Sequence, residues 1–142
     1  MSIALEEARA AGARGEVPVG CVVVRDGTIV ARAGNRTIAD HDPTAHAELI
    51  AIRAAASTLG SERLADCDLY VTLEPCAMCA AAVSFARIRR LYFGAADAKG
   101  GAVENGVRFF AAPTCHHRPE VYGGINESEC GELLKSFFQA RR

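Results

Sequence analysis

The chain has 142 residues, half of them apolar, which is enough to bury the core of one compact domain. Its formal net charge is -1 and its isoelectric point is about 6.4, which excludes a generally basic nucleic-acid binder and leaves only local basic patches for such contacts. No apolar run approaches the roughly 20 residues that span a bilayer, and the N-terminal segment lacks the apolar centre of a signal peptide. We therefore expect a cytoplasmic protein without membrane contact, whose six cysteines are thiols or metal ligands rather than disulfides.

Apolar periodicity along the chain alternates between the patterns of helices and strands. A short amphipathic helix comes first, and two β-rich segments follow, joined by the dipeptide Asp26-Gly27 that favours a two-residue hairpin. An opening hairpin followed by strand–helix alternation predicts a mixed sheet with helices on both faces, in one domain over residues 1–142. The expected helices are residues 3–13, 44–57, 75–85, 107–111 and 127–141, and the expected strands are residues 17–24, 28–34, 68–73, 90–95 and 120–125.

The segment PTAHAE, residues 43–48, places His46 two positions before Glu48 where an apolar run begins. In the middle of a helix these two side chains would point about 200° apart. Thr44 is a candidate N-cap, which puts both residues in the first turn, where their side chains can reach a common point beyond the helix end. The spacing therefore predicts a site at the end of a helix rather than along its side.

A second polar segment, PCAMC, lies at the expected start of another helix. Pro75 suits the first helical position, and Cys76 and Cys79 then share one face. If the two helix starts converge, His46 and the two cysteines form a site with the imidazole and thiolate ligands that Zn²⁺ prefers. Three protein ligands leave a fourth position for water, whose pKa zinc lowers from about 16 to near 7, and Glu48 beside it would shuttle protons.

Each half of this pattern also has a simpler explanation. C-x-x-C occurs in redox pairs and in structural zinc sites, and a single histidine near a helix start is more often a cap or core residue than a ligand. H-x-E combined with P-C-x-x-C is far more specific, because it is the signature of zinc deaminases. The combination favours a catalytic site with one zinc ion per chain.

The segments DPTAHAE and TLEPCAMCAAA resemble the cytidine-deaminase-like superfamily, and most closely its bacterial tRNA-specific adenosine deaminases. The resemblance implies a three-layer α/β/α sandwich with a five-stranded mixed sheet, one zinc ion and a homodimer. It also implies hydrolytic deamination of adenosine to inosine at the wobble position of a tRNA, with the anticodon stem-loop as partner. It covers nearly the whole chain, through EVPVG at 16–20, GNR at 34–36, DAK at 97–99 and FFQARR at 137–142.

The same resemblance implies which residues hold the metal and the RNA. His46, Cys76 and Cys79 would bind zinc, and Glu48 would be the catalytic residue. The remaining residues would contact the substrate: Asn35 by hydrogen bonds to the target nucleoside, Val19 against its base, Asp97 at the neighbouring ribose or base, and Lys99, Phe138, Arg141 and Arg142 on the flanking RNA. After Lys99 the chain departs from many relatives and reads GGAVENG.

Other functions remain open from the sequence alone. A guanine deaminase, or another small-nucleobase or nucleoside deaminase, would share DPTAHAE and P-C-x-M-C. A non-enzymatic alternative is a zinc-stabilised RNA-binding module in which a residue such as Cys67 closes the fourth zinc position, but a closed site needs no proton shuttle such as Glu48. Cys115, His116 and His117 could hold a second metal, although no further ligands cluster near them in the sequence, and a loop at the RNA-facing rim is the simpler expectation.

Overall fold

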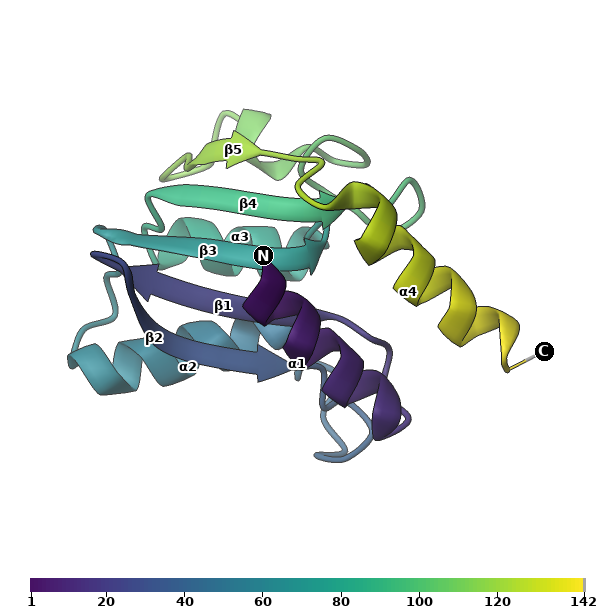
Figure 1. Ribbon diagram of the computed structural model, residues 1–142. Helices are drawn as coiled ribbons and strands as arrows, with labels where there is room; N and C mark the ends of the chain where they lie inside the picture. Colours follow the sequence, from purple (N-terminus) through teal and green to yellow (C-terminus); the bar gives the residue numbers. More distant parts are fainter. Residues whose placement is uncertain (142) are drawn as a thin grey trace.

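A five-stranded mixed sheet, in the order β2-β1-β3-β4-β5, organises the computed structural model, which describes residues 1–141 (Figure 1). Strand β1 is antiparallel to β2 and β3, whereas β3, β4 and β5 run parallel to one another. The strands are β1 (Gly20–Arg25), β2 (Thr28–Gly34), β3 (Cys67–Leu73), β4 (Arg90–Ala95) and β5 (Glu120–Tyr122). The helices are α1 (Ser2–Ala13), α2 (Ala47–Leu59), α3 (Ala77–Phe85), α4 (Glu127–Gln139) and a short 3-10 helix, η1 (Phe109–Ala111).

The β1–β2 hairpin turns where the sequence predicts it. Asp26 has φ 50° and Gly27 has φ 76°, and Arg25 pairs with Thr28 across the turn. Positive φ at both central residues is the type I′ geometry, whose twist matches that of the flanking strands. The opening hairpin is therefore confirmed.

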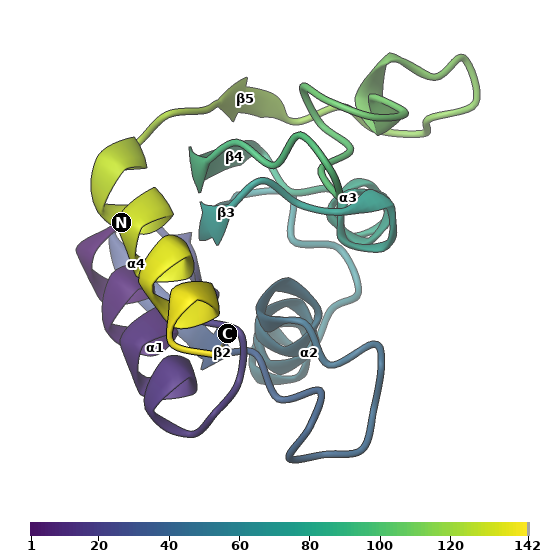
Figure 2. The same ribbon diagram turned by 90° about the vertical axis from the view of Figure 1, so that its right-hand side faces the viewer.

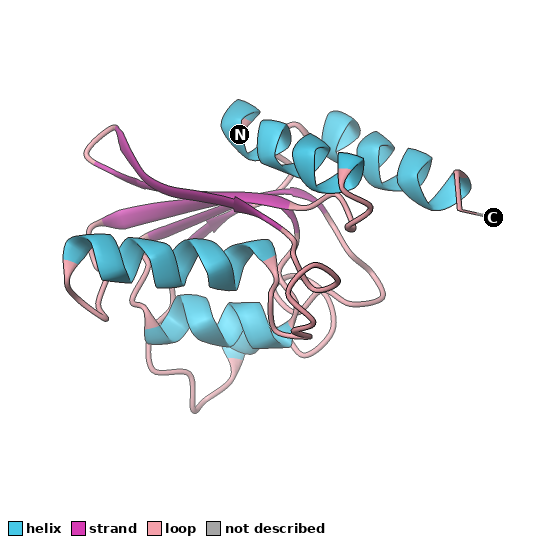
Figure 3. Ribbon diagram, turned by 90° about the horizontal axis from the view of Figure 1, so that it is seen from below, coloured by secondary structure: helices cyan, strands magenta, loops and turns pink. Residues whose placement is uncertain are grey.

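Helices cover both faces of the sheet, so the expected α/β/α sandwich is confirmed. Helices α1 and α4 lie side by side on one face, and α2 and α3 lie on the other (Figures 2 and 3). Leu69, Val71 and Phe93 belong to the main core, where they are packed with small side chains of α2 and α3 such as Ala51 and Ala80. Alanine favours helix formation and lets these helices approach the strands closely.

Helix α1 lies directly on the hairpin because Gly20 carries no side chain. A Cβ at this position would lie 2.0 Å from the carbonyl oxygen of Ala4 and 2.5 Å from the backbone nitrogen of Ala8. No other residue type fits so close an approach. The glycine of EVPVG is thus explained by helix packing.

Three tyrosines form a ladder across the parallel part of the sheet. Tyr70, Tyr92 and Tyr122 are in register on β3, β4 and β5, and their ring centroids are 4.4 and 5.1 Å apart in stacked orientation. Cross-strand aromatic pairs of this kind stabilise a sheet. They are the only tyrosines in the sequence, which contains no tryptophan.

Several expected elements are shorter than the sequence predicts: β1 begins at Gly20 rather than at residue 17, α4 ends at Gln139, and two further elements lose part of their length or their helix type. Strand β5 ends at Tyr122 because Gly123 and Gly124, the latter with φ 81°, turn the chain towards α4. The helix expected at 107–111 is reduced to the 3-10 turn η1. Within residues 1–141, no helix is both long and apolar enough to cross a membrane.

Candidate active site

Helix α2 begins at the edge of the sheet where the parallel strands end, and it begins later than predicted. Thr44 is not its N-cap, because both the N–H and the hydroxyl of Thr44 donate to Asp42 Oδ1, at 2.8 and 2.7 Å. The N-cap is His46, whose backbone is extended (φ -74°, ψ 150°), and Glu48 lies in the first turn. The imidazole therefore projects from the last non-helical residue.

Helix α3 repeats this arrangement after β3. Pro75 does not open the helix as predicted, because Cys76, with φ -72° and ψ 175°, is the N-cap. Cys79 is then the third helical residue and is fully buried. The backbone N–H of Glu74 donates to the carbonyl of Ala95 at 2.8 Å, which fixes the segment between β3 and α3 against the end of β4.

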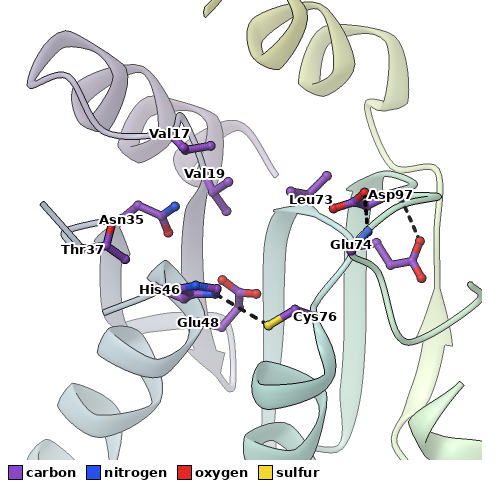
Figure 4. A pocket seen from close by; sticks show the side chains of 11 residues that line it. Val17, Val19, Asn35, Thr37, His46, Glu48, Leu73, Glu74, Cys76 and Asp97 are labelled. Carbon is purple, nitrogen blue, oxygen red and sulfur yellow. Dashed lines mark hydrogen bonds between the residues drawn. The ribbon is translucent and has the colours of Figure 1, made fainter. Parts of the chain in front are cut away.

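The two helix starts converge on one cluster. The ligand atoms of His46, Cys76 and Cys79 all lie within 4.8 Å of one another, and among residues 1–141 they are the group of His, Cys, Asp and Glu side chains that could hold a metal ion. The His46 Nδ1 atom is 3.7 Å from Cys76 Sγ, the contact drawn in Figure 4, and 3.5 Å from Cys79 Sγ. A tetrahedral zinc ion with Zn–N and Zn–S bonds of usual length separates such atoms by about 3.6 Å. The donor set and its spacing fit zinc through Nδ1.

Electrostatics within the cluster also favour a cation. Hydrogen bonding from the Cys79 thiol, and then from His46, lowers the pKa of Cys76 to about 4 against the cost of burial. Hydrogen bonding to Cys76 raises the pKa of His46. A thiolate is the form of cysteine that binds metals, so Cys76 is prepared as a ligand.

Glu48 lies beside this cluster in a nearly water-free position. The residue is only 4% exposed, and burial raises the pKa of its carboxyl group. A raised pKa brings a carboxyl group closer to the range in which it both accepts and returns protons near neutral pH.

A pocket of about 320 Å³ opens above His46, Glu48 and Cys76. Val17, Val19, Asn35 and Thr37 line one side, and Leu73, Glu74 and Asp97 the other (Figure 4). The structure thus brings together the sequence-predicted residues Val19, Asn35 and Asp97 with the metal cluster. Asn35 has a fixed orientation, because its Oδ1 accepts the N–H of Ala47 at 2.8 Å at the start of α2.

The other predicted substrate residues lie outside this pocket. A groove of about 520 Å³ continues from it along α4, sharing Val17, Leu73 and Asp97, and it is lined by Lys99 and Phe138. Arg141 lines neither cavity; its guanidinium stacks 3.6 Å from the centroid of the Phe137 ring. Arg142 lies outside the described residues.

Sequence reasoning missed five pocket residues: Val17, Thr37, Leu73, Glu74 and Gly100. The sequence does mark Glu74 as unusual, because this charged residue stands between an apolar strand and a metal ligand. In the structure it is buried, with 2% of its surface exposed. The segment Cys115–His117 is not part of a metal cluster in the described part of the chain. It is bonded to α3 and to the residues that follow α3: the Ser84 hydroxyl donates to the His117 carbonyl at 2.8 Å, and the His117 ring bonds the Ile88 carbonyl at 2.7 Å.

Similarity to known proteins agrees with this geometry. The family profile described as the cytidine and deoxycytidylate deaminase zinc-binding region matches residues 1–95. The tRNA-specific adenosine deaminase of Agrobacterium fabrum (strain C58 / ATCC 33970) is 64% identical over 142 residues, covering 100% of this chain and 93% of that protein. The chain belongs to the tRNA-specific adenosine deaminase family. Zinc is the cofactor of this deaminase domain, in agreement with the His-Cys-Cys cluster.

Solved structures place the chain within a wider group of deaminases. A structure from a study of A-to-I editing by tRNA:A34 deaminases at the wobble position of transfer RNA is 66% identical, with a TM-score of 0.93 over 94% of this chain and 97% of that one. A guanine deaminase from Bacillus subtilis is 33% identical, with a TM-score of 0.63 over 77% of this chain and 80% of that one. The Agrobacterium fabrum enzyme and the tRNA:A34 deaminase structure thus share about twice the identity of this guanine deaminase, over more of the chain.

Proposed function

We propose that the protein converts adenosine to inosine at the wobble position of a tRNA anticodon, by hydrolytic deamination. The observation that carries this proposal is the Glu48 carboxylate beside a His-Cys-Cys cluster at the floor of a pocket, in a chain 64% identical over its full length to a tRNA-specific adenosine deaminase. The pocket lies at the low end of the roughly 300–1,000 Å³ usual for small-ligand sites, which suits one nucleoside turned out of its stack.

His46, Cys76 and Cys79 would hold the zinc ion, which when bound supplies an activated water near neutral pH. Glu48 would accept a proton from that water as the water oxygen attacks the adenine carbon that bears the amine. The same carboxyl group would pass this proton to the neighbouring ring nitrogen. It would then transfer the second water proton to the departing amine, so that adenosine and water become inosine and ammonia.

The opposite walls of the pocket suit a purine nucleoside. Val19, 5% exposed and directly before β1, offers an apolar surface for the flat base. The side-chain oxygen of Asn35 already accepts the N–H of Ala47. The side-chain NH₂ group of Asn35 is therefore left to donate a hydrogen bond to an acceptor on the nucleoside. Asp97, on the facing wall, would accept a hydrogen bond from the ribose or base next to the target.

The groove along α4 supports an RNA substrate over a free nucleobase. A guanine-sized ligand needs only the inner pocket, whereas neighbouring nucleotides of a loop need a continuing surface. Lys99 and the half-exposed Phe138 offer a cation and an aromatic face there, and single-stranded bases stack on aromatic side chains at about 1–3 kcal/mol each. Arg141 and Arg142 would contact phosphates beyond this groove.

Parallel incubations test this assignment. The protein, loaded with zinc, is incubated with an anticodon stem-loop carrying adenosine at the wobble position, with the same stem-loop carrying guanosine there, and with free adenosine, guanine and cytidine. We expect ammonia release and inosine only with the adenosine stem-loop. Turnover of free guanine with no reaction of the stem-loop would favour the guanine deaminase alternative, and zinc binding without any turnover would favour the RNA-binding module.

We further propose that two copies pair through the outer surfaces of α2 and α3. Phe85 is 65% exposed beside a groove of about 520 Å³ between these helices, and a second copy would remove this side chain from water. Sedimentation equilibrium should give twice the mass of the chain, and Phe85→Glu should give the monomer mass.

Cytoplasmic localisation is proposed from the tRNA substrate and from the six cysteines, none of which is paired in a disulfide.

A further inference from the structure

The Glu74 carboxylate accepts hydrogen bonds from the loop of residues 97–105, which begins in one wall of the pocket. Its Oε1 accepts the backbone N–H of Asp97 at 3.0 Å and the side-chain amide of Asn105 at 2.7 Å. Its Oε2 accepts the backbone N–H groups of Val103, Glu104 and Asn105 at 3.1, 2.9 and 3.0 Å. An ionised carboxylate offers about four lone-pair sites, so five donors use its full capacity to accept hydrogen bonds.

These bonds hold Asp97 at the rim of the pocket. The first residue of the loop, Asp97, is held through its own N–H, and its Oδ1 accepts the N–H groups of Lys99 and Gly100 at 3.1 and 2.9 Å. The loop closes where the Gly101 N–H donates to the Asp97 carbonyl at 2.9 Å. The side chain of Asp97 is therefore presented to the pocket by a backbone that Glu74 fixes.

Gly101 leaves the space that the Glu74 carboxylate occupies. A Cβ at residue 101 would lie 2.5 Å from Glu74 Cδ and 2.6 Å from its Oε2, and 2.5 Å from the Asp97 carbonyl oxygen. A side chain here would push the carboxylate away from its donors. Gly101→Ala thus disturbs the same contact as a change of Glu74, from the opposite side.

We propose that Glu74 is a positioning residue for RNA recognition, acting through Asp97. The inference rests on the proposed function, in which Asp97 contacts the nucleotide beside the target. Glu74 itself, with both oxygens occupied by the loop, is not a proton shuttle. It holds the wall in place before RNA arrives, so that binding does not have to order residues 97–105.

Glu74→Gln is the sharpest perturbation, because it changes one oxygen to an NH₂ group at nearly constant volume. If the remaining oxygen keeps the three N–H groups of residues 103–105, the new NH₂ group replaces the oxygen that accepts from Asp97 and from the Asn105 side chain, and both donors lose their acceptor. We expect KM for the stem-loop to rise about tenfold with kcat within about twofold, because the lost contact is equally present before and during the reaction. Zinc content and melting temperature should show that the fold persists.

A double-mutant cycle separates positioning from a purely structural role. If Glu74 acts through Asp97, then Glu74→Gln should have little further effect on KM in an Asp97→Ala background. Gly101→Ala provides the same cycle should the Gln variant not fold. Glu104→Gln is the matched control, because its exposed side chain changes in the same way on the same loop while its backbone N–H is kept, and its KM should equal that of the wild type.

Three kinds of result would overturn the inference. An unchanged KM for Glu74→Gln, or an additive effect in the Asp97→Ala background, would show that the loop does not act through Asp97. Loss of zinc with a fall in kcat would show that Glu74 instead supports Cys76. If the wild-type protein did not deaminate the stem-loop at all, the proposed function would fail and this inference with it, whereas the other two results leave that function intact.

Discussion

Replacing Glu48 with glutamine separates the chemistry of the site from its architecture. Glutamine has nearly the same shape as glutamate but cannot carry a proton between water and substrate. General acid–base groups contribute about 100- to 10,000-fold to rate, which corresponds to roughly 2.7–5.5 kcal/mol of barrier. We expect the loss of turnover to lie at the upper end of this range, because the other carboxylates of the pocket cannot substitute: both oxygens of Glu74 are bonded to the loop, and Asp97 lies on the facing wall.

The same substitution should not weaken the fold. Burial raises the pKa of the Glu48 carboxyl group, so the ionised side chain opposes folding above that pKa. In protein freed of zinc with a chelator, Glu48→Gln should therefore melt at or above the wild-type temperature at neutral pH. The difference should shrink as the pH falls through the raised pKa, and it should disappear only below 4.5, the ordinary value for a glutamate, where the wild-type side chain is neutral in both states.

Single-turnover rates on the stem-loop, with zinc content by mass spectrometry, check both parts of this prediction. Glu104→Gln serves as the control, because it removes an exposed carboxylate that does not line the pocket. A single-turnover rate within about tenfold of the wild type, with zinc retained, would refute the role of Glu48 as shuttle. Zinc loss in the variant would show instead that the carboxylate supports the metal cluster.

Two further predictions follow from contacts away from the metal. Arg141→Ala should weaken stem-loop binding and lower the slope of log affinity against log salt by roughly one, with Lys135→Ala on α4 as the control. An unchanged slope would place the chain that follows α4 away from phosphate. The Glu16 carboxylate accepts the N–H groups of Ile38 and Ala39, at 3.2 and 2.8 Å. Burial raises the pKa of this carboxyl group, but the hydrogen bonds outweigh burial, and the pKa is lower than the ordinary value. Glu16→Gln should therefore be less stable than wild type at neutral pH, and the gap should close as the pH falls below 4.5 through the folded-state pKa, as measured by thermal melts between about pH 7 and pH 3.

The metal cluster was predictable because its chemistry is carried by residue type. Histidine and cysteine are the side chains that bind zinc, and their spacing at two helix starts restricts how they can meet. The strands at 28–34 and 90–95 have the bounds that the sequence predicts, since each is a β-rich run bounded by turn or charged residues. Local patterns of this kind do not depend on distant parts of the chain.

The exact helix starts were not predictable for the opposite reason. Thr44 has a side chain that suits an N-cap, but its N–H and hydroxyl groups donate to the Asp42 carboxylate, and the N-cap of the helix is His46. Pro75 has the ideal backbone for a first helical position, yet Cys76 takes the cap. In both helices the metal-ligand candidate itself occupies the cap position, and local propensity does not report that preference.

The role proposed for Glu74 was hidden because its partners are mostly backbone groups. Four of its five donors are backbone N–H groups, which nearly every residue type supplies. Most positions of the segment GGAVENG can therefore change without removing a donor from Glu74. Only Gly101 and the side chain of Asn105 carry a residue-specific signal.

The tyrosine ladder gives this protein a built-in optical probe of one region. Because the sequence has three tyrosines and no tryptophan, all of its tyrosine fluorescence originates where β3, β4 and β5 pair. The β1–β2 hairpin, which carries none of these rings, contributes only to far-ultraviolet circular dichroism. Unfolding curves followed by the two signals would coincide if the sheet melts as a unit, and they would separate if the hairpin and the parallel strands come apart in different steps.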